Sequence, residues 1–264
     1  MTLDPSTLRD AVAAATSAAK AAADGPIMSL FRSPALRVET KDDASPVSEA
    51  DKAAEEVIRE HLGARFPDIP VFGEEGGYDG PADSPLRWVV DPIDGTIAFI
   101  RGVPLFGTII ALEEIATGET LAGVIHLPGL GETYAAAKGQ GCTCNGDVVR
   151  VTDGSASGPR LVSAGDRAWF EEAGVADAHD KLTASTPFLR GYTDCFGHAM
   201  VLRGAVSVMV DPGLAPWDLA ATRVLVPEAG GRFWSRPSAL PGKVDAMLGS
   251  DAAVGEVLAS LGWS

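Results

Sequence analysis

The sequence predicts an α/β fold, and three observations point to it. Hydrophobic residues make up 46% of the 264 residues, and a chain of this length buries roughly 70% of its unfolded surface, so a large core is expected. Several β-rich segments follow one another in the first half. After about residue 155, short strands alternate with helices, which is typical of α/β sheets. We therefore expect an N-terminal half over residues 1–150 and a C-terminal half over 151–264, packed as one unit with the site between them.

In the first half, two helix signals stand out. Ser6 is placed to cap a helix that runs to about Ala23, where an Asp-Gly-Pro sequence would close it. A polar turn centred on Pro46 precedes a second helix, for which Ser48 and Asp51 approximate a capping box. A Gly/Asn-rich turn region follows the last strand of this half. The strands expected here are Leu36–Glu39, Pro70–Gly73, Arg87–Asp91, Gly107–Leu112, Leu121–Leu127 and Tyr134–Ala137.

In the second half, helices and strands alternate. Pro227 is expected to end or kink one of the helices, because proline has no N–H to donate. Trp88 and Phe106, both in the first half, are expected in the core. The elements expected in the second half are strands near Leu161 and at Val206–Asp211 and helices at Cys195–Arg203, Trp217–Val226 and Ala252–Leu261.

The charge balance excludes two classes of partner. Asp and Glu number 36 against 21 Lys and Arg, a net charge of −15, which repels nucleic acid and anionic membranes. No apolar run approaches the ~20 residues of a membrane span, and the Ala-rich N-terminus is typical of a helix rather than a signal peptide. Cys142, Cys144 and Cys195 are too few for a disulfide framework, so we expect reduced thiols and a cytoplasmic protein.

The strongest signal for chemistry is the segment D-P-I-D-G-T that starts at Asp91. The proline is expected to stop the preceding strand, and Gly95 permits a sharp turn. Asp91 and Asp94 can then converge with the Ile93 carbonyl between them, an oxygen set that hard divalent cations prefer. The amides of Gly95 and Thr96 follow as donors for a phosphate oxygen. Taken alone, such a segment is more often an Asx turn.

Further acids have both a functional and an ordinary interpretation. Glu74 and Glu75 follow a strand and precede two glycines, which also describes an exposed acidic turn. Asp218 lies at a helix start, where the helix dipole favours any acid. Asp51 can serve as a capping-box acid alone. Each signal is weak by itself, but their combination is far more specific.

That combination resembles the inositol monophosphatase family of magnesium-dependent phosphatases. The matching stretches are SPVSEAD at 45–51, GEE at 73–75, WVVDPIDGT at 88–96, PWDLAA at 216–221 and EAGG at 228–231. The resemblance covers residues from about 10 to 255. It implies a layered αβαβα fold of the sugar-phosphatase type, a metal-dependent phosphomonoesterase and a homodimer.

The resemblance also implies a set of metal ligands. Glu74, Asp91 and the Ile93 carbonyl would hold a first Mg²⁺, and Asp91, Asp94 and Asp218 a second. A third ion would share Glu74, and Mn²⁺ is the alternative metal. Carboxylates this close are tolerable only with cations among them, and these cations also make an acidic site attractive to phosphate.

Catalytic and substrate-binding roles follow from the same resemblance. A metal-activated water would attack the phosphate without a covalent enzyme intermediate, with Thr96, oriented by Asp51, helping Glu74 to activate the water. Asp194 and Asp211 are placed near the leaving group, although Asp194 also fits a helix N-cap. The residues implied in substrate binding are Gly95, Thr96, Asp194, Asp211 and Asp218.

Within the family, the chain is most similar to the histidinol-phosphate phosphatase branch. The stretches that indicate this are FIRGVPLFGTIIAL at 99–112, YTDC at 192–195 and VDPGLAPWD at 210–218. The implied reaction is hydrolysis of L-histidinol phosphate in histidine biosynthesis. Inositol-1-phosphate is the alternative substrate. An inactive metal-binding regulatory protein is the alternative of another class, and the complete set of ligand residues argues against it.

Three residues keep open roles at this stage. Lys41 either steadies the metal site or is a solvated surface lysine. Trp217 is either a wall of the site or part of the core. His198 is expected to pack in the interior rather than to bind a metal.

Overall fold

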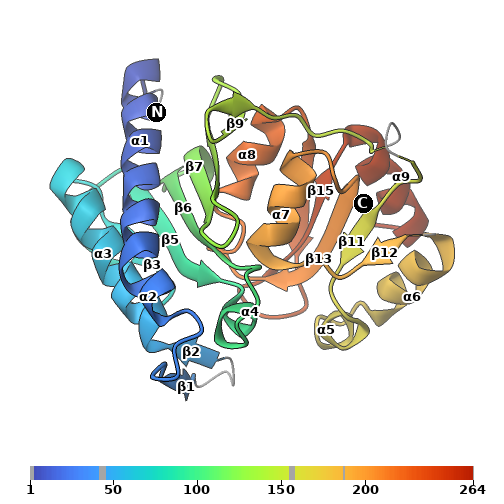
Figure 1. The fold of residues 1–264 in the computed structure, drawn as a ribbon. Helices are drawn as coiled ribbons and strands as arrows, with labels where there is room; N and C mark the ends of the chain where they lie inside the picture. Colours follow the sequence, from blue (N-terminus) through green and yellow to red (C-terminus); the bar gives the residue numbers. More distant parts are fainter. Residues whose placement is uncertain (1–2, 42–45, 155–157, 187, 264) are drawn as a thin grey trace.

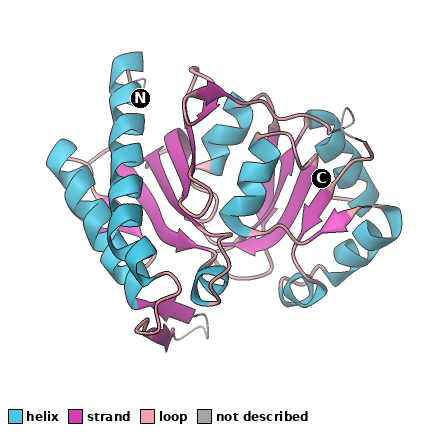
Figure 2. Cartoon of the chain, viewed as in Figure 1, coloured by secondary structure: helices cyan, strands magenta, loops and turns pink. Residues whose placement is uncertain are grey.

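The computed structural model describes residues 3–41, 46–154, 158–186 and 188–263. Its elements form five layers in the order helices, sheet, helices, sheet, helices (Figures 1 and 2). The predicted α/β class and its αβαβα layering are therefore confirmed. A candidate site lies where the first sheet faces the middle layer of helices.

The first outer layer consists mainly of α1 (Pro5–Ala22) and α3 (Glu49–Arg65), which pack on each other and on the first sheet. The predicted cap of α1 is wrong, because Asp4 rather than Ser6 begins the helix. The Asp4 carboxylate accepts hydrogen bonds from the N–H groups of Ser6 and Thr7, at 2.9 and 3.1 Å. Ser6 is thus a first-turn residue whose N–H the true cap satisfies.

The end of α1 is a kink. A wider helical turn, η1 (Ala23–Ile27), leads into the short α2 (Met28–Leu30). Gly25 has non-helical backbone angles, φ −89° and ψ −110°, and Pro26 follows it. α1 thus ends at Ala22, close to the predicted end, but the Asp-Gly-Pro sequence redirects the chain into further helical turns instead of closing the helix.

The cap of α3 is as predicted. Ser48 Oγ accepts a hydrogen bond from the N–H of Ala50 at 3.2 Å. Asp51 Oδ2 accepts one from the N–H of Ser48 at 2.8 Å, which completes a capping box. Asp51 is buried, so this acid is fixed in position by the helix start itself.

Two short strands precede α3. β1 (Val38–Thr40) pairs antiparallel with β2 (Pro46–Ser48). Pro46 begins a strand rather than centring a turn. Proline has no N–H to donate to a neighbouring strand, and the first residue of a strand is one of the positions where this is tolerated. The predicted turn residues 42–45 lie outside the described residues.

The first sheet has the strand order β10-β9-β8-β7-β6-β5-β3-β4. Its neighbouring strands are antiparallel except for the parallel pair β3 and β5. The region predicted as a Gly/Asn-rich turn also contains the short β9–β10 hairpin. The strands are β3 (Val71–Gly73), β4 (Gly77–Asp79), β5 (Leu86–Asp94), β6 (Gly107–Glu114), β7 (Glu119–Leu127), β8 (Glu132–Ala137), β9 (Cys142–Cys144) and β10 (Asp147–Val148).

The end of β5 differs from the prediction. The strand continues to Asp94, so Pro92 does not stop it. Asp91 pairs with Ile109, and the next pair along the ladder is Asp94 with Gly107. A bulge between these pairs accommodates the proline, which has no N–H to contribute to a regular ladder. Bulges re-aim side chains, and this one lies between the two aspartates.

The middle layer contains α7 (Asp194–Leu202) and α8 (Thr222–Glu228), which lie between the two sheets (Figure 1). α8 begins later than predicted because the chain before it forms a turn. Asp218 Oδ2 accepts a hydrogen bond from the N–H of Ala215 at 2.8 Å and so closes this turn. Pro227 lies in the last turn of α8, and the helix ends one residue later, in agreement with the prediction.

The second sheet has the strand order β12-β11-β13-β15-β14 and carries α5, α6 and α9 on its outer face. Sequence analysis missed α5 and α6, which are short, and β14 and β15, whose hydrophobic pattern is irregular. The predicted division near residue 150 stays a prediction, and residues 155–157 lie outside the described residues. The elements are β11 (Val162–Ala164), α5 (Arg167–Glu172), α6 (Ala176–Ser185), β12 (Leu189–Arg190), β13 (Val208–Leu214), β14 (Arg232–Pro237), β15 (Val244–Gly249) and α9 (Asp251–Leu261).

Hydrophobic residues fill each space between layers. One cluster joins α1 and α3 to the first sheet, and it includes Trp88 and Phe106, both fully buried as predicted. A second surrounds α7 and α8, and a third lies under α9. The three cysteines are free thiols. Among the described residues, none of the helices combines the length and the apolar character needed to cross a membrane.

The close approach of β7 to the middle layer gives a stability test. A Cβ atom at Gly123 would lie 2.8 Å from Ala221 Cα and 2.9 Å from Val224 Cγ1. We expect Gly123→Ala to lower the free energy of unfolding by about 1–3 kcal/mol, because the packed layers must move apart. Urea denaturation followed by circular dichroism measures this change.

Gly63 is the matched control. It lies inside α3, and a Cβ atom there would meet no atom within 4 Å. Gly63→Ala should raise the free energy of unfolding by about 1 kcal/mol through helix propensity. A stabilising effect of Gly123→Ala would contradict the close packing of β7 on α8.

Candidate active site

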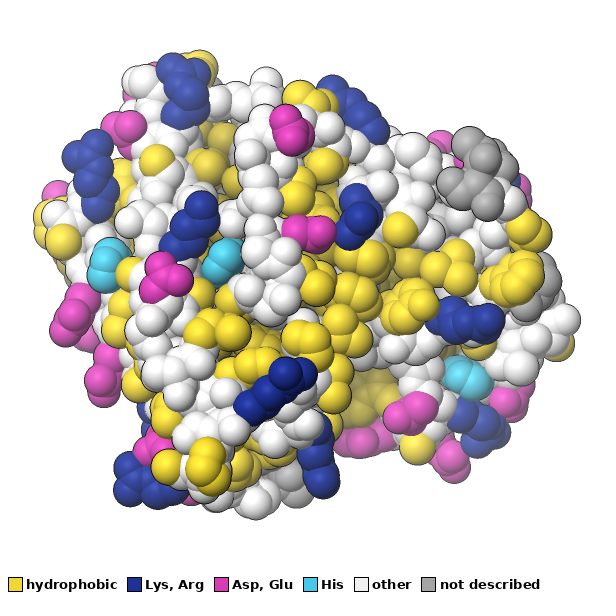
Figure 3. All heavy atoms as spheres, viewed as in Figure 1, with side chains coloured by type: hydrophobic (Ala, Val, Ile, Leu, Met, Phe, Trp, Pro, Cys, Tyr) yellow, Lys and Arg dark blue, Asp and Glu magenta, His cyan; other side chains and the backbone are white. Residues whose placement is uncertain are grey.

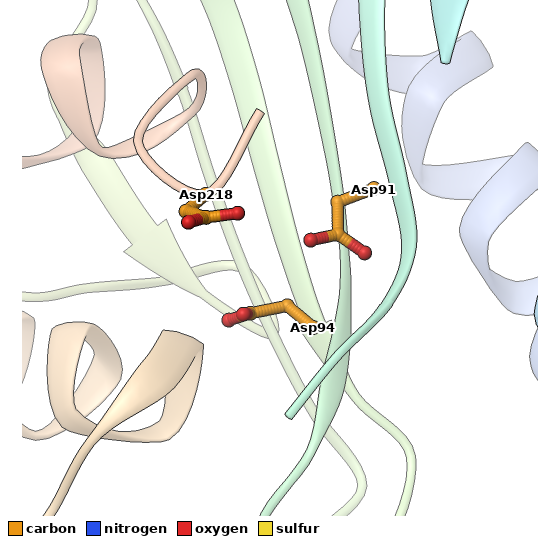
Figure 4. A group of neighbouring side chains, drawn as sticks. All are labelled: Asp91, Asp94 and Asp218. Carbon is orange, nitrogen blue, oxygen red and sulfur yellow. The ribbon is translucent and has the colours of Figure 1, made fainter. Parts of the chain in front are cut away.

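Three aspartates from two layers meet at one place (Figure 4). Asp91 and Asp94 come from the bulged end of β5, and Asp218 comes from the turn before α8. One carboxylate oxygen of each lies within 4.8 Å of the others. The structure thus brings together the three aspartates that are expected, from the sequence, to hold the second metal ion.

These carboxylates are held in an unfavourable environment. Burial is the largest cause of a raised pKa at each of them, and it raises the pKa of Asp218 to about 7. The charges of Glu74 and Asp94 raise the pKa of Asp91 further. Asp91 Oδ1 is buried and accepts no hydrogen bond within the part of the chain that the structure describes. A buried oxygen normally has a partner, and this all-oxygen set fits a hard divalent cation.

Glu74 and Glu75 lie in the turn between β3 and β4, next to β5. The N–H of Glu74 donates to the carbonyl of Val90 at 3.1 Å. Lys41 Nζ donates to one carboxylate oxygen of each glutamate, both at 2.7 Å. Burial lowers the pKa of Lys41, but these two bonds outweigh it and the net shift is upward. Lys41 is therefore part of this cluster, and the interpretation as a solvated surface lysine is wrong.

Thr96 begins α4 (Thr96–Ile100), directly after the β5 bulge. Gly95 has φ 87°, a left-handed conformation that favours glycine, and it turns the chain into this helix. Thr96 Oγ1 lies 3.0 Å from the Ile93 carbonyl and 3.3 Å from Asp51 Oδ1. The other oxygen of Asp51 holds the α3 cap, and burial raises the pKa of this carboxyl group. Thr96 therefore contacts both Asp51 and the Ile93 carbonyl, as the sequence predicts.

Asp194 and Asp211 add two more acids from the second half. Asp211 is buried in β13, and its pKa is raised by burial and then by the charges of Asp194 and Asp218. Asp194 is the first residue of α7 and has φ 56°, which is uncommon for a residue other than glycine. Thr193 occupies the N-cap position, so the N-cap interpretation of Asp194 is wrong.

The main chain at the start of α7 also contacts the cluster, which sequence analysis missed. The N–H of Cys195 donates to Asp94 Oδ2, and Cys195 Sγ lies 3.8 Å from the Asp94 carbonyl. Burial raises the pKa of the Cys195 thiol, so it is neutral and a poor nucleophile. The two residues are 101 positions apart, and no local pattern signals their contact.

A second missed residue, Lys243, brings positive charge toward Asp218. Its charge opposes the rise in the pKa of Asp218 that burial causes. Lys243 Nζ lies 5.3 Å from the centre of the Trp169 ring, and Trp169 Nε1 donates to the Pro212 carbonyl at 2.7 Å. Lys243 follows a Pro-Gly turn with no other sign of function, so only the fold reveals it.

Trp217 and His198 are packed side chains. The Trp217 ring lies edge-on to Phe72, with 5.7 Å between ring centres. His198 is buried, and its Nδ1 lies 2.9 Å from Thr222 Oγ1. Burial lowers the pKa of His198 to about 4, so the ring is neutral near pH 7. This agrees with the predicted packing role of His198.

Comparison with known proteins gives one consistent result. Residues 8–254 match the sequence pattern of the inositol monophosphatase family. Histidinol-phosphatase of Chlorobaculum parvum is 42% identical over 74% of both chains, and that of Streptomyces coelicolor is 39% identical over 80% of this chain and 82% of the relative. A solved structure of an inositol monophosphatase from Zymomonas mobilis superposes with a TM-score of 0.79 at 30% identity, over 96% of this chain and 98% of the other.

The acids of this cluster should make stability depend on pH. The folded-state pKa of Asp218 is about 7, against an ordinary value of 3.8. Between about pH 4 and 7 the folded chain holds more protons than the unfolded chain, so raising the pH favours unfolding. We expect the melting temperature in chelator to fall from pH 5 to pH 8, as measured by circular dichroism.

Added Mg²⁺ should reverse this trend. Cations compete with protons for the same oxygens, so the gain in melting temperature should be larger at pH 8 than at pH 5. An equal gain at both pH values would contradict binding at the buried carboxylates.

Proposed function

The chain belongs to the inositol monophosphatase family of metal-dependent phosphomonoesterases, and we propose that it hydrolyses L-histidinol phosphate in histidine biosynthesis. Histidinol-phosphatases are among its most similar relatives. The observation that carries the proposal is the pair Asp194 and Asp211, two acids beside the aspartate cluster. The leaving group of histidinol phosphate carries an ammonium and an imidazole, which such acids can bind.

We propose that the cluster holds two or three Mg²⁺ ions, with Mn²⁺ as the alternative metal. Glu74, Asp91 and the Ile93 carbonyl form one ligand set, and Asp91, Asp94 and Asp218 form the other. The orphaned oxygen of Asp91 supports this assignment. Bound ions would supply charge stabilisation for the phosphate and a lowered pKa for a bound water.

The chain's own groups then position the reactants. Thr96, held by Asp51, and Glu74 orient a water, and Glu74 accepts its proton as the water oxygen bonds to phosphorus. The ester P–O bond breaks on the opposite side, and the leaving oxygen takes a proton from solvent. The N–H groups of Gly95 and Thr96 are proposed to bind phosphate oxygens.

Inositol-1-phosphate is the second candidate substrate. Inositol-1-monophosphatases of Mesorhizobium japonicum and Rhizobium meliloti are 32% and 33% identical to the chain. An inositol leaving group offers only neutral hydroxyls, which gain less from buried carboxylates than an ammonium does. A catalytically inactive regulatory protein is disfavoured because the sequence retains all the proposed ligand residues.

We also propose a homodimer in the cytoplasm. Four exposed hydrophobic residues lie in neighbouring segments: Met28, Ile97, Val103 and Leu130. The first segment is joined to the residues around Val103 by the hydrogen bond from Arg32 Nε to the Gly102 carbonyl. The segment of Leu130 lies against the same residues, where Gly129 closely approaches Pro104. Hydrophobic side chains gather in the middle of the face seen in Figure 3. Apolar surface of this kind is typical of contacts between copies of a chain, and sedimentation velocity measures whether the dimer forms.

The proposed cytoplasmic location rests on the cysteines, because free thiols fit a reducing compartment.

A panel of phosphate esters tests the substrate. We expect phosphate release with Mg²⁺ to show a higher kcat/KM for L-histidinol phosphate than for inositol-1-phosphate or fructose 1,6-bisphosphate. Asp91→Asn is the control, and it should lower kcat by at least ~10³-fold on every ester while remaining folded. A preference for inositol-1-phosphate would overturn the substrate but not the family.

Two variants test the acids on the leaving-group side. Asp211→Asn and Asp194→Asn should each lower kcat/KM for histidinol phosphate by at least ~10-fold, because a charged hydrogen bond to the ammonium is lost. Hydrolysis of p-nitrophenyl phosphate should change little, because the proposed metal ligands are intact. Equal losses on both esters would mean that the two acids support the metals or the fold instead.

A further inference from the structure

A buried glutamate lies beneath the turn that carries Glu74. Glu55, in α3, is 3% exposed. Its Oε2 accepts a hydrogen bond from the N–H of Glu75, and its Oε1 accepts one from the N–H of Gly76, both at 2.8 Å. The carboxylate thus holds the two backbone amides that directly follow Glu74. No motif of the sequence analysis includes this residue.

Arg59 makes this burial tolerable. One turn along α3, its Nε and Nη2 donate to Glu55 Oε1 at 2.9 and 2.8 Å. The same guanidinium donates to the carbonyls of Val71 and Gly77, at 3.2 and 2.7 Å. The ion pair therefore binds the backbone of β3, of β4 and of the turn between them.

Two glycines of the turn make room for this carboxylate. A Cβ atom at Gly73 would overlap the Glu55 carboxyl group, and one at Gly76 would lie 2.7 Å from Glu55 Oε1. Neither glycine has a positive φ. The G-E-E-G sequence is thus explained by contact with Glu55 rather than by backbone strain.

The other side of the turn faces the site. Both Glu74 and Glu75 bond to Lys41, and the charge of Glu74 acts on Asp91. The turn is therefore held by Glu55 through its backbone, while its two acids bond to Lys41 and Glu74 lies close enough for its charge to act on Asp91. A displaced turn would move Glu74 relative to β5.

We propose that Glu55 is a positioning residue that sets the metal affinity of the site by fixing Glu74. The proposal rests on the proposed role of Glu74 as a metal ligand. Glutamine at position 55 keeps one acceptor oxygen but turns an amide group toward donors, so one of the two backbone N–H groups loses its partner. Groups that orient metal ligands typically change metal affinity by about 10- to 100-fold when removed.

The test measures Mg²⁺ binding directly. Isothermal titration calorimetry of Glu55→Gln should give a dissociation constant about 10- to 100-fold higher than that of the wild type. At saturating Mg²⁺, the KM for the phosphate ester should stay within about twofold, because the phosphate-binding amides and Asp211 are untouched. Unchanged Mg²⁺ affinity in a folded Glu55→Gln protein would overturn the proposal.

Glu113→Gln is the matched control. Like Glu55, Glu113 is an acid paired with an arginine, 2.9 Å from Arg87 Nε, although it is less buried. Among the described residues, no hydrogen bond joins it to the β3–β4 turn. This variant should keep wild-type Mg²⁺ affinity. A matching loss in Glu113→Gln would show a general effect of removing a charge and would also overturn the proposal.

A second variant reaches the same contact from the other side. Gly76→Ala keeps the charge of Glu55 but displaces its carboxylate, and it should also weaken Mg²⁺ binding. The loss in Glu55→Gln/Gly76→Ala should be smaller than the combined single losses, because both substitutions break one interaction. Additive losses would contradict a shared mechanism.

The failure of the metal assignment is distinguishable from the failure of this proposal. Glu74→Gln should weaken Mg²⁺ binding if Glu74 is a ligand. Wild-type affinity in Glu74→Gln would reject the ligand role itself. Weak binding in Glu74→Gln together with wild-type affinity in Glu55→Gln would reject only the positioning role.

Discussion

Several carboxylates buried at one point form the constraint on which the rest of the structure depends. The buried Asp91 and Asp94 of the first sheet face the half-buried Asp218 from the turn before α8, so their charges are close together and only partly screened by water. Nearby groups donate hydrogen bonds to the acids of the site. Lys41 donates to Glu74, and the N–H groups of Cys195 and Ala215 donate to Asp94 and Asp218. Within the described ranges of the chain, Asp91 Oδ1 accepts no hydrogen bond, and a buried carboxylate oxygen of this kind fits a divalent cation. Because the acids come from different layers, a bound cation would also tie those layers together.

The two sides of the site are built in the same way. On the proposed metal side, the pair Glu55–Arg59 holds the backbone of a turn. On the proposed leaving-group side, the N–H of Gly213 donates to Asp245 Oδ1 at 3.2 Å, and Arg236 Nε donates to the other oxygen at 3.0 Å. In both places an arginine neutralises a buried acid, and the acid fixes backbone next to a functional residue. An acid that binds the backbone of a turn can keep the side chains of that turn in place without touching them.

The sequence predicted what short-range chemistry determines. The capping box of Ser48 and Asp51 and the closeness of Asp91 to Asp94 depend on residues three apart, and both are present. The layering and the site residues followed from motifs spread along the whole chain. Interpretations failed where a neighbouring strand or an earlier residue decided the outcome, as with Pro92, which a bulge accommodates.

Other residues could not be found from the sequence because their meaning is tertiary. Glu55 reads as an ordinary helical acid one turn before Arg59, and only the arrival of the β3–β4 turn makes it a backbone acceptor. The Cys195 amide reaches Asp94 only after the second half has folded onto the first, and the charge of Lys243 acts on Asp218 from 25 positions further along the chain. Long-range contacts of this kind leave no spacing signal in one sequence.

The contact between Glu55 and the two glycines has an evolutionary consequence. A substitution that adds a side chain at Gly73 removes the space that Glu55 occupies, so it is tolerable only together with a smaller residue at position 55. Loss of Glu55 in turn leaves the partly buried Arg59 without its carboxylate partner. The three positions should therefore change in concert along a lineage, with the arginine following the acid. Descendants that keep the glycines but lose the glutamate would be recognisable as chains released from the demand for tight metal binding.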